Sequence, residues 1–399
     1  MFQTLTAWLA DLNVARATIS AFALISVVLG CKFLRAPLVD VVRIPMLGSH
    51  NGRIAWIGLG QLGVSLGLLG MAVSGPETGS LWLLVWMTWF VCISMSFQDI
   101  SLDAWRVESY PASQQPEAIV AYLWGYRVAM LVASAGSLAL AHWFSWTLSY
   151  LVMAALQLCC VSFTLRVARG RLFVDPYDPA VEHLSLGQRW AAFSVAMHQL
   201  RARFPSVQLF QVIVLLMLFR IGDSILGAMW LPYVLSLGFD KLTISWASQL
   251  LSLFPTLLGI SVAGLALQRC SLSAVLLFAI VLSIGGNALL PLISVWTNSL
   301  CLSLVTGIDG FGNGFASSAL LGLIAHLVQR GFTATQHAVF ASLPFLAGQI
   351  FAAPTGWLVD RIGFEVFLLS TTLFVFPPLA LCWQLRRLLA SLKNAEAGL

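Results

Sequence analysis

The stretch WLLVWMTWFVCISMSFQDISLDAW, residues 82–105, decides the fold of this chain. No charged residue occurs between Glu77 and Asp99, and a second aspartate, Asp103, then follows four positions later. About 20 consecutive apolar residues are enough for a helix to cross the hydrocarbon core of a bilayer. The stretch therefore predicts a membrane-spanning helix that carries acidic and amide side chains near its far end.

The rest of the chain has the same character. Of its 399 residues, 59% are hydrophobic and 9% are charged. Soluble domains carry about 25% charged residues, so this composition excludes a soluble globular protein. Runs this apolar form helices in lipid, because a helix satisfies its own backbone hydrogen bonds. We predict an all-α integral membrane protein with about eleven complete spans, at residues 17–38, 54–75, 80–104, 118–143, 146–168, 208–237, 244–267, 273–292, 299–328, 335–358 and 364–385.

The positions of the basic residues predict the orientation. When the spans are numbered in order, most arginines outside them fall in alternate loops, and the C-terminal tail with Arg386 and Arg387 belongs to the same set. Loops rich in Lys and Arg stay in the cytoplasm. We therefore expect a multi-pass protein whose C-terminus is cytoplasmic.

The chain lacks the usual signs of metal binding or enzyme chemistry. Its seven cysteines lie in or at the ends of apolar runs, without a Cys-x-x-Cys pair, and its six histidines are scattered. Neither a nucleophile elbow nor a zinc-protease helix is present. We expect no metal, no cofactor, no nucleic-acid partner and no enzymatic activity.

The two halves of the chain resemble each other. The segment ASQQPEAIVAYL at 112–123 parallels ATQHAVFASL at 334–343, and ARATIS at 15–20 parallels DKLTIS at 240–245. Repeats of this kind are typical of secondary transporters, which bind substrate near the midplane at the interface of the repeats. The pattern predicts two pseudo-symmetric bundles of six helices.

The repeat also predicts the domain boundaries. We expect an N-terminal bundle at 1–168, a cytoplasmic linker with an amphipathic helix at 169–207, a C-terminal bundle at 208–386 and a tail at 387–399. The register places Met1 opposite the middle of the span 208–237. We therefore expect the first helix of this sequence to be truncated at its N-terminal half.

Several motifs resemble the muropeptide permeases of the major facilitator superfamily. They are QDISLDAW at 98–105, GYRVAMLVASAG at 125–136, KFLRAPLVD at 32–40, FRIGDS at 219–224 and FTATQHAVFASL at 332–343. The resemblance implies a symporter of the bacterial inner membrane that works by alternating access. It would import anhydromuropeptides, which are disaccharide-peptide fragments of peptidoglycan, together with protons for cell-wall recycling.

Charged residues inside the spans are the candidate site residues. A charge at the bilayer centre costs about 2.5–3.5 kcal/mol on insertion scales, so it needs a partner or a function. Guanidinium groups bind carboxylates in a bidentate manner, which suits a substrate with peptide carboxylates. We expect the substrate-binding residues to be Gln98, Arg127, Arg220, Asp309 and Asn313.

Two further groups complete the expected site. Asp99 and Asp223 are buried carboxylates suited to proton coupling, with Arg127 as the expected partner of Asp99. Structural or gating roles are expected for Asp40, Asp103 and Arg106. Arg106 is expected to pair with Asp103 at the membrane interface, and Asp40 to reach that interface as well.

Other interpretations remain open at this stage. Arg220 and Asp223 could be a structural ion pair, Arg127 could only brace Asp99, and Asp309 could accompany a helix hinge in DGFGNGF. The chain could carry another acidic metabolite such as acetyl-coenzyme A, or be a remnant without transport activity.

Overall fold

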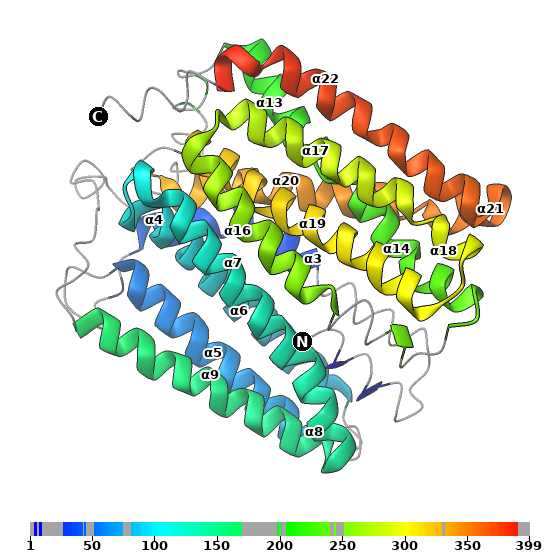
Figure 1. Ribbon diagram of the computed structural model, residues 1–399. Helices are drawn as coiled ribbons and strands as arrows, with labels where there is room; N and C mark the ends of the chain where they lie inside the picture. Colours follow the sequence, from blue (N-terminus) through cyan, green and yellow to red (C-terminus); the bar gives the residue numbers. More distant parts are fainter. Residues whose placement is uncertain are drawn as a thin grey trace. The chain divides into compact units, whose positions relative to one another are not determined.

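Helices form the described part of the chain, which contains no β-strand in this computed structural model (Figure 1). The described residues are 4, 5, 8, 9, 27–42, 44, 52–74, 81–169, 198, 201, 205–239, 243, 244, 251–328 and 332–389. Most of the expected linker 169–207 and tail 387–399 lies outside them, as do residues 17–26 of the first expected span, the repeat segment 15–20 and most of the repeat segment 240–245.

One compact unit, called unit 1, comprises Met1–Ser109, Val128–Met197 and Gln329–Val339. In it α5 packs against both α6 and α9, and the ribbons of α5 and α9 run side by side in Figure 1. Leu5 and Trp8 are buried near the N-terminus, and the ring of Trp8 stacks on Trp146. Its helices are α3 (Val27–Gly30), η1 (Lys32–Leu34), α4 (Ala36–Val41), α5 (Gly52–Val73), α6 (Leu81–Ser109), the π-helix η5 (Val132–Gly136), α8 (Ser137–Trp143) and α9 (Trp146–Arg169).

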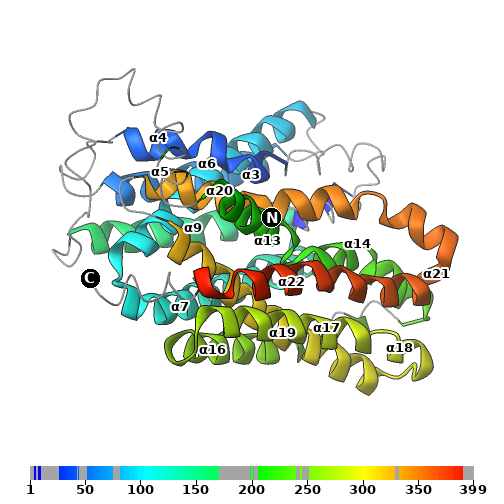
Figure 2. The same ribbon diagram turned by 90° about the horizontal axis from the view of Figure 1, so that it is seen from above.

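A second compact unit, unit 2, comprises Tyr110–Arg127, His198–Val328 and Phe340–Leu399. Here α19 packs against α16 and α17, and Figure 2 shows α17 and α19 side by side. Its helices are η4 (Ala112–Gln114), α13 (Ser206–Leu218), α14 (Ile221–Ser236), α16 (Leu253–Arg269), α17 (Leu272–Leu289), α18 (Leu292–Val295), α19 (Ser299–Leu327), α21 (Thr355–Thr371), η7 (Thr372–Val375) and α22 (Phe376–Gln384).

Two helices are shared by both units. The first part of α7 (Gln115–Leu131) belongs to unit 2, where Ile119 and Leu123 pack against α16. The first part of α20 (Thr333–Ala352) belongs to unit 1, where Ala334 and Ala338 pack against α4 and α6. These are the segments that the longer internal repeat aligns, so each sequence half contributes the same element to the unit built mainly by the other half.

Seven described helical segments, some made of two or three consecutive helices, are long and apolar enough to cross a membrane. Each expected run from residue 54 onward contains a described helix, and α19 and α20, with 29 and 20 residues, are also long enough to cross. The seven are Gly52–Val73, Trp82–Ser109, Gln115–Trp143, Trp146–Arg166, Ser206–Ser236, Leu272–Val295 and Thr355–Gln384.

Glycines let α16 and α19 approach each other closely. A Cβ atom on Gly259 would overlap the backbone carbonyl of Phe311, and one on Gly314 would overlap the carbonyl of Thr256. A backbone atom cannot move aside as a flexible side chain can. Gly314, in the segment DGFGNGF, therefore serves close helix packing.

We expect Gly314→Ala to destabilise the protein, because α16 and α19 must separate to admit the methyl group. Overpacking costs about 1–3 kcal/mol, and the better helix propensity of alanine returns at most about 1 kcal/mol. Gly285→Ala is the control, since a Cβ atom at that position meets no atom within 4 Å. Thermal unfolding in detergent should show a lower midpoint for Gly314→Ala only. An equal or higher midpoint for that variant would contradict the packing argument.

Candidate substrate-binding and gating sites

Two arginines in unit 2 converge on one amide oxygen. The Oδ1 atom of Asn313 accepts hydrogen bonds from Arg220 Nη2 at 2.8 Å and from Arg127 Nη2 at 3.1 Å. Arg220 also donates to Ser317 Oγ at 2.9 Å and pairs with Asp223 at 3.2 Å. These five residues are called the arginine cluster. It brings together three segments that are far apart in the sequence, on α7, on α19 and at the start of α14.

The arginine cluster has positive charge and a hydrogen-bond donor available for an anion. Asn313 and Ser317 lie four positions apart on α19, so they share one face of that helix and hold Arg220 from one side. The two guanidinium groups repel each other, because the amide that joins them carries no charge. The Nε atom of Arg127 is buried and has no hydrogen-bond partner among the described residues. A carboxylate placed between the two arginines would relieve the repulsion and accept from both.

Asp309 lies one turn before Asn313 on α19. Its carboxylate interacts electrostatically with Asp223 and with Arg220. A Cβ atom on Gly286 would come within 3.2 Å of Asp309 Oδ1, so a glycine leaves room for this carboxylate beside α17. The predicted residues Arg127, Arg220, Asp223, Asp309 and Asn313 thus form one neighbourhood inside unit 2.

A second group of charges lies in unit 1, on α6 and on the helices that pack against it. Asp103 pairs with Lys32 at 3.3 Å and lies 3.5 Å from Nδ1 of His337, whose Nε2 is 3.4 Å from Nη2 of Arg106. Asp99 interacts electrostatically with Lys32 and Asp103. We call these five residues the α6 charge cluster.

The α6 charge cluster corrects two expectations. Lys32, not the Arg127 expected from the sequence, is the basic partner of Asp99, because Lys32 begins η1 and its side chain reaches α6. Arg106 is buried rather than interfacial, and it reaches His337 in addition to its electrostatic interaction with Asp103.

Gln98 directly precedes Asp99 on α6, and its side chain bonds to a different helix. Its Oε1 atom accepts a hydrogen bond of 3.1 Å from Nε2 of Gln157 on α9, so it links two helices of unit 1. The remaining amide hydrogens of both side chains are donors suited to a sugar or peptide group.

A buried ionic network in unit 1 fixes the start of α20. Arg53 donates to Asp40 at 2.7 Å and to both carboxylate oxygens of Glu108, at 2.9 and 3.1 Å. Asp40 also accepts from the backbone N–H groups of Ala334 at 3.2 Å and of Thr335 at 2.8 Å, and from the Thr335 hydroxyl. A carboxylate is favoured at a helix N-terminus, where backbone donors are free. The network therefore ties α4, α5, α6 and α20 together.

Asp40 does not extend outward, as was expected for a side chain that reaches the membrane interface. Its residue is 2% exposed, because Arg53 and the start of α20 enclose its carboxylate. The sequence analysis missed Arg53, Glu108 and His337 altogether. Arg53 and Glu108 lie at the ends of apolar runs, where charges usually face water, and only the long-range packing shows that they are buried.

These buried charges, the long apolar helices and the internal repeat define a polytopic membrane carrier. Residues 4–343 match the Major Facilitator Superfamily, and the chain belongs to this family. It is therefore a transporter, with a small molecule as its substrate, and a multi-pass membrane protein.

The chain is similar to named bacterial permeases along nearly its whole length. It is 28% identical to the anhydromuropeptide permease of Escherichia coli K12 over 390 residues, which cover 97% of this chain and 76% of that protein. It is 27% identical to the transporter AmpG 4 of Rickettsia conorii over 382 residues, which cover 95% of this chain and 90% of that protein.

Solved structures share the fold at low identity. The human organic anion transporter MFSD10 has a TM-score of 0.65 at 13% identity, covering 96% of this chain and 89% of that one. The proton:xylose symporter XylE has a TM-score of 0.64 at 11% identity, covering 97% and 90%. At such identities the likeness establishes the fold alone.

We expect Arg53→Met to unfold the network around Asp40, because Asp40 and Glu108 would keep buried charges without their cation. Breaking a buried pair in this way costs about 3–5 kcal/mol. Arg361→Met is the control, since Arg361 is exposed and only covers the ring of Trp357. The thermal unfolding midpoint should fall strongly for Arg53→Met and little for Arg361→Met. Equal midpoints would show that the network contributes no stability.

Proposed function

We propose that this transporter imports anhydromuropeptides across the bacterial inner membrane by proton symport, for the recycling of cell-wall fragments. The observation that supports this most is the arginine cluster, in which Arg127 and Arg220 share the single amide oxygen of Asn313. The similarity to a protein named anhydromuropeptide permease supports the same substrate.

The arginine cluster suits the acidic end of such a substrate. A carboxylate has two oxygens that can accept one guanidinium group each, and charge-assisted hydrogen bonds are about twice as strong as neutral ones. Substrate carboxylate would displace Asn313 as the shared acceptor of Arg127 and Arg220. Asn313 would then be free to bind an amide or sugar group, and Asp309 would balance the remaining positive charge. Gln98, in unit 1, is proposed as a further donor to such groups.

Proton coupling follows from competition for the same arginine. Arg220 pairs with Asp223 in the structure, and a substrate carboxylate would compete for its guanidinium group. A buried carboxylate that loses its cation favours the protonated form. Substrate binding and protonation of Asp223 would thus favour each other. Asp99, whose basic neighbour is Lys32, would be the second proton site.

Gating is proposed for the network around Asp40 and for Asp103 and Arg106. Together they hold the first turns of α20 within unit 1. Alternating access requires such contacts to form in one state and break in another. With the C-terminus in the cytoplasm, as we propose, the start of α20 lies on the cytoplasmic side.

Uptake of labelled anhydromuropeptide is the direct test. Cells that lack their own permease should accumulate the label when they express this chain, and a protonophore should abolish the accumulation. Labelled acetyl-coenzyme A serves as the comparison substrate, because the arginine cluster would also suit other acidic metabolites. Uptake of that compound alone would replace the proposed substrate, and uptake of neither would overturn the proposed function.

We expect Arg127→Gln to raise the KM for uptake about tenfold or more, because it removes one charged donor, and such bonds contribute about 1.5–3 kcal/mol. Arg269→Gln is the matched control, since Arg269 is exposed at the end of α16. Both variants should be present in the membrane in similar amounts. An unchanged KM in Arg127→Gln would remove Arg127 from the substrate site.

We expect Asp99→Asn to lose proton-driven accumulation but to keep exchange of substrate down its gradient. The amide cannot take up a proton, yet it keeps the size of the carboxyl group. Asp360→Asn, at an exposed position on α21, is the control. Accumulation measured with and without a protonophore decides the point: an Asp99→Asn protein that still concentrates substrate cannot use Asp99 for coupling.

A further inference from the structure

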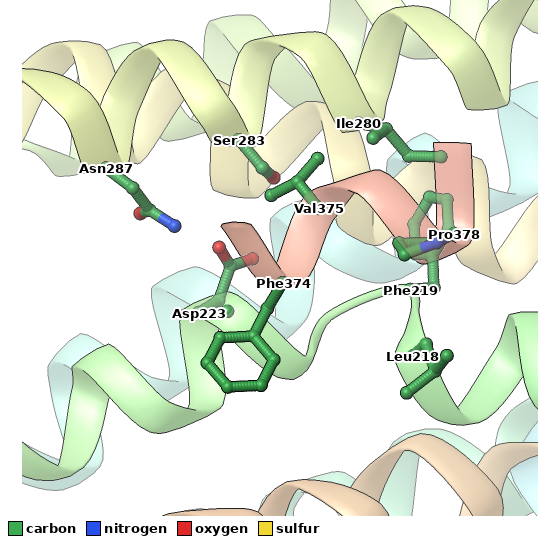
Figure 3. Close-up of a pocket in the computed structure, with 10 residues that line it drawn as sticks. Leu218, Phe219, Asp223, Ile280, Ser283, Asn287, Phe374, Val375 and Pro378 are labelled. Carbon is green, nitrogen blue, oxygen red and sulfur yellow. The ribbon is translucent and has the colours of Figure 1, made fainter. Parts of the chain in front are cut away.

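A small cavity in unit 2 lies beside the arginine cluster, between the start of α14, the helix α17 and the junction of η7 with α22. Most of its lining is apolar, and three of its residues carry polar side chains: Asp223, Ser283 and Asn287. Figure 3 shows these three side chains directed toward the same space from two different helices. Ser283 and Asn287 are four positions apart and so share one face of α17.

Asn287 is the unusual member of this group. It is fully buried, with 0% of its surface exposed, and neither its Oδ1 nor its Nδ2 has a hydrogen-bond partner among the described residues. Buried amides are almost always paired, because an unpaired one loses its hydration without compensation. Gly222 leaves the amide open, since a Cβ atom there would lie 3.3 Å from Asn287 Nδ2.

The size of the cavity limits what can satisfy this amide. The free volume of the cavity is about 10 Å³. That is room for about one water molecule, which needs two to four polar partners. A metal ion would bind Oδ1 but leave the N–H donors unpaired, whereas a water molecule can both accept from Nδ2 and donate to a carboxylate.

We propose that this cavity binds one water molecule that joins Asp223 to Asn287 and Ser283, and that this water is the immediate proton donor to Asp223. The proposal rests on the proposed function, in which substrate competes for Arg220. When Arg220 turns to the substrate, the water passes a proton to a carboxylate oxygen of Asp223 and regains one from solvent. Asn287 is then a positioning residue, because it holds the water without titrating.

Two variants test the role of the water in transport. Asn287→Leu keeps the side-chain volume and removes the amide, and Ser283→Ala removes one hydroxyl. We expect Asn287→Leu to lower proton-driven accumulation about tenfold and to shift the pH of half-maximal uptake, while exchange at equal substrate concentrations keeps the wild-type rate. Ser283→Ala should shift the same pH less. The control is Ser162→Ala, whose hydroxyl is exposed and bonds only its own helix, at Leu158, with no expected shift.

A structure of the purified wild-type protein, at a resolution that shows ordered water, tests the site without any transport measurement. One solvent peak within hydrogen-bonding distance of Asp223, Ser283 and Asn287 is expected, and its absence would overturn the proposal even if Asn287→Leu fails to fold. An Asn287→Leu protein with wild-type accumulation and pH profile would also overturn it. Sodium-dependent uptake that this variant alters would instead indicate a cation site. If the wild type does not carry anhydromuropeptide, the proposed function fails, while the solvent peak still decides whether the water is bound.

Discussion

The cost of an unpaired charge away from water is the constraint on which the rest of this structure depends. Arg53 is the clearest case, because its side chain is 8% exposed and meets two carboxylates from different helices. These carboxylates belong to Glu108 and Asp40, and Asp40 also accepts hydrogen bonds from the backbone at the start of α20. Neither acid could remain at its position without the arginine. Four helices are therefore placed by one connected set of charges rather than by apolar contacts alone.

The apolar contacts explain a different part of the fold. Helices in lipid gain little from the hydrophobic effect, so close packing at small residues has to hold them together. The contact of α16 with α19 at Gly259 and Gly314 follows this principle. Asn313 directly precedes Gly314 in the chain, and its side chain accepts hydrogen bonds from both arginines. Close packing and the polar site thus depend on the same turn of α19.

Much of the fold was predictable because it depends on patterns within short segments of the sequence. Apolar runs predicted the helices, and the repeat predicted that the segments 112–123 and 334–343 correspond to each other. For the candidate site, charge in an apolar run was enough to select Arg127, Arg220, Asp223 and Asp309, which the structure brings close together.

What could not be predicted depends on residues distant in sequence. His337 lies more than 200 positions from Arg106, and no periodicity connects them. Lys32, rather than the expected Arg127, is the basic neighbour of Asp99, because the chain turns at η1. The apolar run around η1 gives no sign of this turn in the sequence. The sequence does not single out Asn287, which stands among Gly, Ala and Leu. Only the structure shows that its amide is buried without a hydrogen-bond partner among the described residues.

The sharing of α7 and α20 between the two units has a mechanical consequence. In each of these helices the first part packs in one unit, and the backbone continues without a break into the segment that belongs to the other unit. Each shared helix has a weak point soon after it passes into its second unit: the π-helix Val132–Gly136 follows α7, and Pro344 lies inside α20. Both features remove or loosen backbone hydrogen bonds, so a helix bends there most easily. We therefore expect each shared helix to stay straight along most of its length and to bend at one place, the π-helix after α7 or Pro344 in α20.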